Sequence, residues 1–192
     1  MLGQLTSMPG VLGIDPGIEN TGWGLLRLEP DPTNFVGSDI QYTVRHVGHG
    51  VISTRPDTPL PKRLRAIFVA VRALLHEHEL LFVAIEEYMV GLNRKSGALV
   101  LQAKGAVLTA CGSANTNVRT YTASAIKKEI TGRGNAKKED VRIAISHLLH
   151  IEGIRFSHES DALATAATGI RKISDDDRDR LLRKPPGKQG RR

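Results

Sequence analysis

The stretch from Val11 to Gly24 constrains the fold of this chain more than any other part of the sequence. A short apolar run of strand length ends at Asp15, a Pro-Gly turn follows at once, and a second strand-like run begins at Thr21. A strand that ends in this way presents a single carboxylate at the edge of a sheet. Asp-Pro-Gly is also ordinary turn chemistry, so this motif by itself leaves a functional and a purely structural interpretation about equally open.

The length of 192 residues suits one domain that can bury a core without metal or disulfide staples. The single cysteine rules out an internal disulfide and fits a reducing compartment. Residues 1–10 lack the basic and apolar regions of a signal peptide, and no apolar run approaches the length of a membrane span. These features predict a cytoplasmic protein with a short N-terminal extension.

The formal net charge of +7 indicates a polyanionic partner. The last 19 residues, from Ser174, contain seven Lys or Arg and four Asp, which is +3, so the body of the chain keeps +4. The basic character is therefore not confined to the tail. A merely solubilising surface is the alternative.

Three strand-like runs come first, at Val11–Ile14, Thr21–Leu28 and Tyr42–Thr54. Their short connections favour an antiparallel meander. The segment Glu29–Asp39, rich in Pro, Asp and Asn, is predicted to be an exposed loop insertion.

A strand, helix, strand unit follows the meander. The apolar spacing from Pro61 to Glu79 predicts an amphipathic helix, and Leu80–Ile85 is a continuous apolar run that predicts a strand buried on both faces. Ser96–Gly112 then reads as a helix and Val118–Tyr121 as a strand parallel to the previous one. The sequence thus predicts an α/β fold with a mixed five-stranded sheet, three antiparallel strands followed by parallel strands, flanked by helices.

The remainder is predicted to be helical. Thr122 or Ser124 can cap a helix over Ala125–Ile130, and further helical patterns cover Val141–Leu149 and Ser160–Ile173. Residues 11–173 would then form the domain. The charged segment 174–192 is predicted to be a disordered tail.

Two later places put acids where the apolar pattern ends. The buried strand finishes in Glu86 and Glu87, which alternation points to opposite faces of the sheet, so that only one can join Asp15. Glu86 is our choice, although periodicity alone barely separates the two. His158 and Asp161 would share one face of a helix that begins near them, with Glu159 pointing away. Capping of that helix by Ser157 or Ser160, with acids in the first turn, is the structural alternative.

Carboxylates and an imidazole that converge at one end of a sheet repel one another unless cations lie between them. Oxygen ligands suit Mg²⁺ or Mn²⁺, and an imidazole shifts the preference toward Mn²⁺. Two such ions can activate a water and stabilise both oxygens of a phosphodiester displacement. The sequence lacks the cysteine cluster or paired-histidine helix of a zinc site.

The order of these motifs, from Gly13-Ile14-Asp15-Pro16-Gly17 and Thr21-Gly22-Trp23-Gly24 through Ala84-Ile85-Glu86 to Asp161-Ala162-Leu163-Ala164, resembles the RuvC family of bacterial Holliday-junction resolvases. The resemblance covers about residues 11–170. It implies an RNase H-like fold, a homodimer, and paired symmetric nicks across a four-way DNA junction during recombination and repair. It also implies the RuvA-RuvB branch-migration complex as a partner.

The resemblance places the family's catalytic, metal-binding acids on four residues of this chain, which we call the tetrad: Asp15, Glu86, His158 and Asp161. Position 158 carries Asp in many members and His in some, which leaves the choice between Mg²⁺ and Mn²⁺ open. The resemblance implies two such ions per active site as the cofactor.

The resemblance also places phosphate-contacting lysines on Lys127, with a catalytic role, and Lys138. Arg133, between Gly132 and Gly134, is a further candidate DNA contact, since the glycines allow close approach to a backbone. The neighbouring Lys128 and Lys137 are predicted to lie on solvated helix faces instead.

The segment after Glu86 is apolar and then basic, and Tyr88, Met89, Arg94 and Lys95 are its candidate DNA contacts. In the family an aromatic from this segment wedges into the junction, and Met89 stands at that position here. Closure of the sheet edge by Tyr88 and Met89 is the alternative.

The sequence therefore predicts a metal-dependent, structure-selective endonuclease that resolves four-way junctions. A general or flap-type nuclease of the same fold and a junction-binding protein with weak catalysis are alternatives. A sugar-kinase-like phosphotransferase is a rival from another class, because Asp-x-Gly turns also cradle phosphates, but 192 residues hold only one such lobe.

Overall fold

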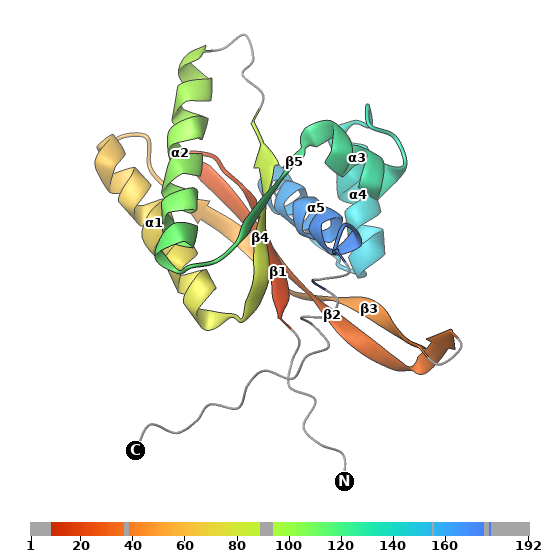
Figure 1. The fold of residues 1–192 in the computed structure, drawn as a ribbon. Helices are drawn as coiled ribbons and strands as arrows, with labels where there is room; N and C mark the ends of the chain where they lie inside the picture. The colour runs from red at the N-terminus through yellow and green to blue at the C-terminus, as the bar shows by residue number, and fades with distance from the viewer. Residues whose placement is uncertain (1–8, 37–38, 89–93, 155, 175–176, 178–192) are drawn as a thin grey trace, which may run out of the picture.

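The computed structural model describes residues 9–36, 39–88, 94–154, 156–174 and 177. Its centre is one five-stranded sheet in the order β3-β2-β1-β4-β5 (Figure 1). The strands are β1 (Gly10–Asp15), β2 (Asn20–Val36), β3 (Asp39–Ser53), β4 (Leu80–Glu87) and β5 (Val118–Thr122). β1 pairs antiparallel with β2 and parallel with β4, and β4 pairs parallel with β5. The predicted mixed sheet is confirmed.

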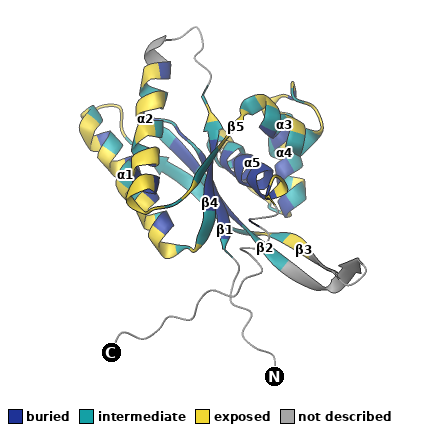
Figure 2. Ribbon diagram, in the orientation of Figure 1, coloured by how far each residue is buried: buried dark blue, intermediate teal, exposed yellow. Residues whose placement is uncertain are grey.

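Helices cover both faces of the sheet. The helices are α1 (Leu60–Glu77), α2 (Arg94–Ser113), α3 (Ala123–Thr131), α4 (Lys138–Leu149) and α5 (Ser157–Arg171). α1 and α2 lie side by side on one face, and α3, α4 and α5 lie on the other (Figure 1). α5 is almost wholly buried, whereas α1 and α2 expose their outer surfaces to solvent (Figure 2).

Strand alternation divides the core between these two layers. Leu12 and Ile14 of β1 pack with α1 and α2, while Val11 packs with α4 and α5. In β4 the same rule sends Val83 and Ile85 to the first layer and Phe82 and Ala84 to the second. Both strands are therefore buried on both faces, as the continuous apolar run of β4 predicts.

Glycines in β1 and β2 let α5 lie directly on the sheet. A Cβ atom added to Gly13 would lie 2.0 Å from the Ala162 carbonyl oxygen, and one added to Gly22 would lie 2.0 Å from the His158 carbonyl oxygen. Any other residue would push the helix away from the strands. These two glycines thus set how closely the first turns of α5 approach the end of β1.

One prediction about the fold is wrong. The described part of the predicted loop insertion, residues 29–36 and 39, is strand, because β2 continues to Val36 and pairs with β3 from Asp39 onward. β1 stops pairing with β2 at Arg27, so beyond that point β2 and β3 form a two-stranded ribbon with open outer edges. Prolines can occupy such an edge without removing a ladder hydrogen bond, and the shift in register after Asp31 takes up the remaining irregularity.

The ends of the chain are described only in part. Of the predicted tail, Ser174 and Asp177 are described, and Asp177 is buried against Arg119 of β5. The other tail residues and most of the N-terminal extension lie outside the described residues. Within the described part of the chain, no helix combines the length and apolar character that a membrane crossing requires.

Candidate active site

Asp15 and Glu86 end neighbouring parallel strands and share one face of the sheet. Ile14 of β1 stands opposite Ile85 of β4, so the residues that follow them are neighbours at the carboxyl ends of both strands. Because Ile14 and Ile85 pack toward α1 and α2, alternation turns Asp15 and Glu86 toward α5. Glu87 is exposed and belongs to the opposite face. The parallel register thus decides between the two glutamates that periodicity alone barely separated.

His158 and Asp161 enter the same place from the first turns of α5. The helix begins at Ser157, so these two residues lie one turn apart on the face that meets the sheet. The structural alternative of a serine cap does not hold for this helix. Its N-cap is Phe156, and the Glu159 carboxylate accepts the Phe156 backbone N–H at 3.1 Å. Ser160 donates instead to the Ser157 carbonyl.

Two contacts join these residues to each other and to the basic helix α4. His158 Nδ1 lies 2.6 Å from an Asp15 carboxylate oxygen, although the two residues are 143 positions apart in the chain. The Lys138 ammonium donates to Asp161 at 3.1 Å. The Asp161 side chain is 14% exposed and that of Asp15 is 19% exposed, so both carboxylates are largely shielded from water. The structure therefore brings all four tetrad residues to one end of the sheet.

Burial, together with repulsion between the acids, raises the proton affinity of Glu86 and Asp161. Burial, followed by repulsion from Asp15 and Asp161, raises the pKa of Glu86 to about 7, against the opposing effect of Lys138 and Lys127. Burial also raises the pKa of Asp161, although Lys138 partly offsets this effect. Glu86 therefore has the carboxylate that is most costly to keep ionised near neutral pH.

The nearby cations respond in the opposite sense. The hydrogen bond with Asp15 raises the pKa of His158, and the charge of Asp161 raises the pKa of Lys138. Both groups thus favour their positive forms. Protonated His158 and Lys138 supply positive charge where the carboxylates need it.

The donor set fits a hard divalent cation. Among the described residues, no group of three or more His, Cys, Asp and Glu side chains is already arranged to hold an ion. His158 contacts Asp15, and Lys138 contacts Asp161. Three carboxylates that face one another nevertheless provide the oxygen ligands that Mg²⁺ or Mn²⁺ prefers. A bound cation would also remove the repulsion that raises the pKa of Glu86.

Residues that the sequence analysis missed hold the turn after Asp15. Thr21, which is fully buried, donates its hydroxyl to the Gly17 carbonyl at 2.7 Å. Thr54 donates to the Ile18 carbonyl, and the buried Arg63 donates to the Thr54 hydroxyl at 2.8 Å. Thr21 was detectable in principle, as a polar residue at a position where strand alternation predicts burial. Arg63 was not, because the helical pattern of α1 gives no reason to bury a guanidinium.

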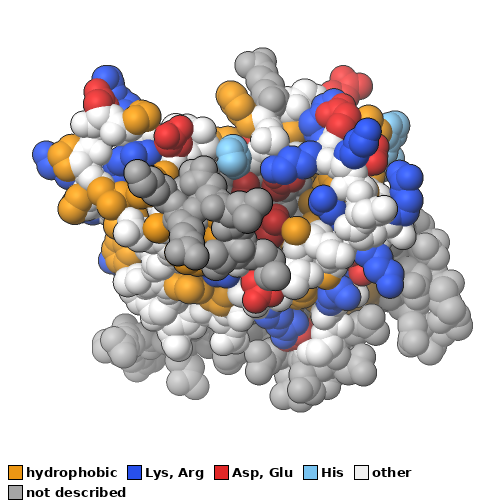
Figure 3. All heavy atoms as spheres, turned by 90° about the horizontal axis from the view of Figure 1, so that it is seen from above, with side chains coloured by type: hydrophobic (Ala, Val, Ile, Leu, Met, Phe, Trp, Pro, Cys, Tyr) orange, Lys and Arg blue, Asp and Glu red, His pale blue; other side chains and the backbone are white. Residues whose placement is uncertain are grey.

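Basic side chains lie beside the acids. Lys127 is close enough to lower the pKa of Glu86, and Lys138 contacts Asp161. Arg133 pairs with Asp140 at 3.5 Å on the surface. Seen from above, acidic side chains lie in the middle of this face, and Lys and Arg side chains lie to either side of them (Figure 3).

The candidate DNA contacts after Glu86 are only partly described. Tyr88 is half-buried, and its hydroxyl would lie 2.7 Å from a Cβ added to Gly97, so the ring packs close against the start of α2. This position fits the alternative in which Tyr88 closes the sheet edge. Met89 lies outside the described residues, as do the side chains of Arg94 and Lys95.

A sheet of this order, with acids at the ends of β1 and β4 facing a helix that carries a histidine and a further acid, defines an RNase H-like nuclease. A sequence model of the family described as "Crossover junction endodeoxyribonuclease RuvC" matches residues 11–169. The chain belongs to this family, whose nucleases use divalent metal ions.

Individual relatives agree with this assignment. The RuvC protein of Orientia tsutsugamushi strain Boryong is 34% identical over 158 residues, which are 82% of this chain and 92% of that protein. That of Acidovorax sp. strain JS42 is 35% identical over 82% of each chain. The solved structure of T. thermophilus RuvC in complex with Holliday junction substrate superposes with a TM-score of 0.73 at 31% identity, over 84% of this chain and 92% of that one.

Proposed function

We propose that this chain is a structure-selective endonuclease that resolves four-way DNA junctions by paired symmetric nicks during recombination and repair. The observation that carries the proposal is the convergence of Asp15, Glu86 and Asp161 on one end of the sheet, beside Lys127 and Lys138. Family membership and a relative solved with Holliday junction substrate support the choice of DNA junction. Action on DNA makes the cytoplasm its proposed location.

The tetrad would hold the metal ions, which we propose to be two Mg²⁺ or Mn²⁺. Two ions at such a site would favour an attacking hydroxide and neutralise charge on the scissile phosphate. His158 would have to lose its proton before it and Asp15 could bind a metal ion. Lys138 would have to move away from Asp161 before that carboxylate could bind one. Because an imidazole is one of the ligands, we expect Mn²⁺ to support cleavage at least as well as Mg²⁺.

The basic residues would bind and orient the phosphate. Lys127 is proposed to stabilise the charge that develops on the phosphate in the transition state, since its ammonium already acts on the Glu86 carboxylate. Lys138, once released from Asp161, would contact the DNA backbone. Arg133 is proposed as a further backbone contact on the same exposed side.

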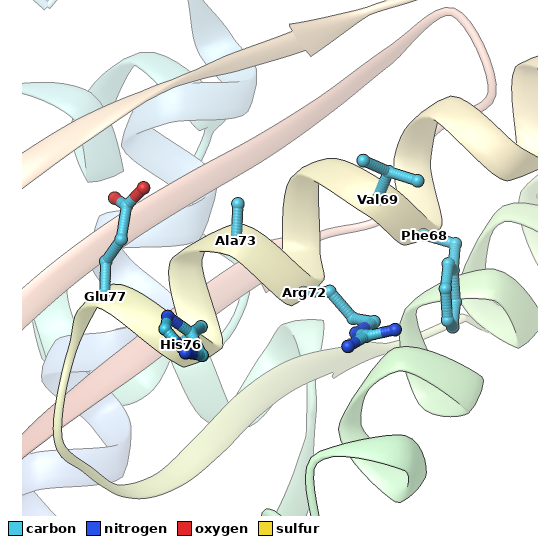
Figure 4. Close-up of a pocket in the computed structure, with 6 residues that line it drawn as sticks. All are labelled: Phe68, Val69, Arg72, Ala73, His76 and Glu77. Atoms are coloured by element: carbon cyan, nitrogen blue, oxygen red, sulfur yellow. The ribbon is translucent and has the colours of Figure 1, made fainter.

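A second copy of the chain is the proposed partner for the outer surface of α1 and α2. Val69 on α1 and Leu101 and Leu108 on α2 are large apolar residues that are 47%, 46% and 41% exposed. A shallow hollow follows α1 beside them, lined by Phe68, Val69, Arg72, Ala73, His76 and Glu77 (Figure 4). A homodimer through this surface would leave both active sites free, because the tetrad faces α5 on the other side of the sheet. We also propose the RuvA-RuvB branch-migration complex as a partner, on the basis of family membership.

The experiment that tests the proposed function compares cleavage of labelled four-way junction, duplex, flap and single-stranded DNA, each with Mg²⁺ or Mn²⁺. Paired symmetric nicks on the junction alone are expected. Asp161→Asn should lower the cleavage rate about a hundredfold or more yet retain junction binding, whereas Glu87→Gln, on the opposite face, should change neither. Nicking of every substrate would indicate a general nuclease, and binding without cleavage would indicate an architectural protein.

A further inference from the structure

Two histidines outside the tetrad face each other on the edge strand β3. His49 Nδ1 lies 2.9 Å from His46 Nε2, and the ring centroids are 4.9 Å apart with the rings tilted at 48°. Both residues are only partly buried, so solvent can reach them. The proposed nuclease chemistry uses neither of them.

A β-bulge is what brings these rings together. Residues three apart in a regular strand point to opposite faces of the sheet. Here Leu26 of β2 stands opposite His46, but its neighbour Leu25 stands opposite Gly48, so Val47 is an extra residue in β3. Such a bulge resets the alternation and re-aims the side chains that follow it.

The partners of the two histidines confirm that they share a face. His46 stands opposite Leu26, which packs with α4 and α5. His49 stands opposite Gly24, where an added Cβ would lie 2.7 Å from the Leu163 side chain of α5. Val47 packs with the α1 and α2 layer on the other side. Both rings therefore lie on the α5 side, at the edge of the sheet.

The separation of the two nitrogens suits a shared metal ion as well as a hydrogen bond. With metal–nitrogen bonds of about 2.0–2.1 Å, two imidazole nitrogens on one ion lie about 2.9–3.4 Å apart for bond angles between square and tetrahedral. Burial and the neighbouring His49 lower the pKa of His46, which favours the neutral ring. Neutral imidazole is the form that binds transition metals.

We propose that His46 and His49 form a second metal site for an imidazole-preferring divalent ion, with Zn²⁺ as its representative. Among the described residues, no third His, Cys, Asp or Glu completes a group of ligands with this pair, so water would fill the remaining positions. The bound ion would bridge the two sides of the bulge and hold the β2–β3 register. The site differs from the tetrad in ligand chemistry, because both of its protein ligands are nitrogen, whereas three of the four tetrad side chains offer oxygen.

The test uses the full chain with Asp15→Asn and Asp161→Asn, which remove two carboxylates of the tetrad and so weaken its competition for Zn²⁺. Isothermal titration should show one Zn²⁺ bound. Adding His46→Gln or His49→Gln should weaken that binding at least about tenfold, since one of two protein ligands is lost. His76→Gln, which changes an exposed histidine of α1, is the matched control and should leave it unchanged.

A second measurement needs no substitution at the pair. In ¹⁵N-resolved imidazole spectra, Zn²⁺ should shift the resonances of His46 Nε2 and His49 Nδ1 and leave those of His76 in place. Failure of Zn²⁺ to shift these two nitrogens, or equal affinity in the His46→Gln, His49→Gln double variant, would overturn the proposal and leave an ordinary hydrogen bond between the rings.

Discussion

The Glu86 carboxylate is largely buried and lies near the charges of Asp15 and Asp161, so ionising it costs free energy in the metal-free protein. Its folded-state pKa of about 7 lies above the unfolded value of 4.5. A carboxyl whose pKa is raised on folding binds its proton more tightly in the folded state, so stability falls as pH rises from 4.5 through 7. Above pH 7 the full free-energy cost of ionising Glu86 in the folded protein is present.

Glu86→Gln should therefore stabilise the metal-free protein. With allowance for screening of a partly exposed group, we expect the free energy of unfolding at pH 8 to rise by about 1–3 kcal/mol. The gain should shrink toward pH 5, where Glu86 is protonated in the folded state. Urea denaturation in the presence of a chelator measures the gain at pH 8 and its decrease toward pH 5. The matched control is Glu87→Gln, which should have no comparable effect; a wild-type stability for Glu86→Gln at pH 8 would refute the raised pKa.

At the scale of elements, the position of α5 depends on the absence of side chains in β1 and β2. Gly22→Ala would place a Cβ 2.0 Å from the His158 carbonyl oxygen, so the first turn of α5 must shift. We expect the free energy of unfolding to fall by about 1–3 kcal/mol. The cleavage rate should fall by a larger fraction than the free energy of unfolding, because His158 and Asp161 move with the helix.

The control for this variant is a glycine with free space around it. A Cβ added to Gly105 of α2 meets nothing within 4 Å. Gly105→Ala should therefore raise the free energy of unfolding by about 0.5–1 kcal/mol through helix propensity, instead of lowering it. Denaturation curves and junction cleavage for the two variants measure the difference. Normal cleavage by Gly22→Ala would show that the close approach of α5 does not position the site.

The segment after α5 is fastened to β5 by a buried carboxylate. Asp177 accepts hydrogen bonds from the Ser174 hydroxyl and the Arg119 guanidinium, each at 2.7 Å, and Arg119 also lies over the Phe82 ring at 4.2 Å. Burial acts to raise the pKa of Asp177, but the bonds from Ser174 and Arg119 outweigh it and hold the pKa below its ordinary value. Arg119 thereby joins the segment after α5 to β4 and β5.

Asp177→Asn should lower the free energy of unfolding at pH 7 by about 1–3 kcal/mol, since a charged hydrogen-bond acceptor is lost. A depressed pKa stabilises the fold above the unfolded pKa, and that contribution disappears as pH falls through the lower folded pKa. The difference between variant and wild type should thus narrow below about pH 4. Asp57→Asn, which breaks an exposed pair with Arg55, should show no measurable loss at any pH. A constant difference across the acid range would contradict this account.

At the scale of the whole molecule, the two helical layers differ in what they leave exposed. The layer of α3, α4 and α5 holds His158 and Asp161 of the tetrad, whereas α1 and α2 together expose the apolar side chains of Val69, Leu101 and Leu108. If a second copy covers that surface, Val69→Asp with Leu108→Asp should convert a dimer into a monomer, because two unpaired charges would be buried at the interface. Light scattering after size-exclusion chromatography measures the mass directly.

Ile143→Asp is the control for the dimer. It changes a residue of α4 that is 46% exposed and lies in the other layer, so the dimer should persist. Paired nicking should be lost together with the dimer, while single nicks continue. A wild-type protein that stays monomeric at all concentrations, or a Val69→Asp, Leu108→Asp variant that stays dimeric, would remove the basis for this interface.

The sequence by itself determined the features that depend on neighbours along the chain. The strand that ends at Asp15, the double burial of the Glu86 strand and the shared helical face of His158 and Asp161 follow from periodicities of two and 3.6 residues. Those periodicities are local, so they survive without knowledge of the fold. The resemblance then ordered the same residues into one site.

Only the tertiary structure decided what depends on contacts between distant segments. The parallel register of β1 and β4 turned Glu86, and not Glu87, toward Asp15. Packing of α5 on Gly22 joined His158 to Asp15 across 143 residues, and the approach of α4 placed Lys138 on Asp161. Pairing with β3 made a strand of the segment that composition had marked as a loop. Strand register, ion pairs and burial are set by long-range packing free energy, and no local pattern in a single chain encodes it.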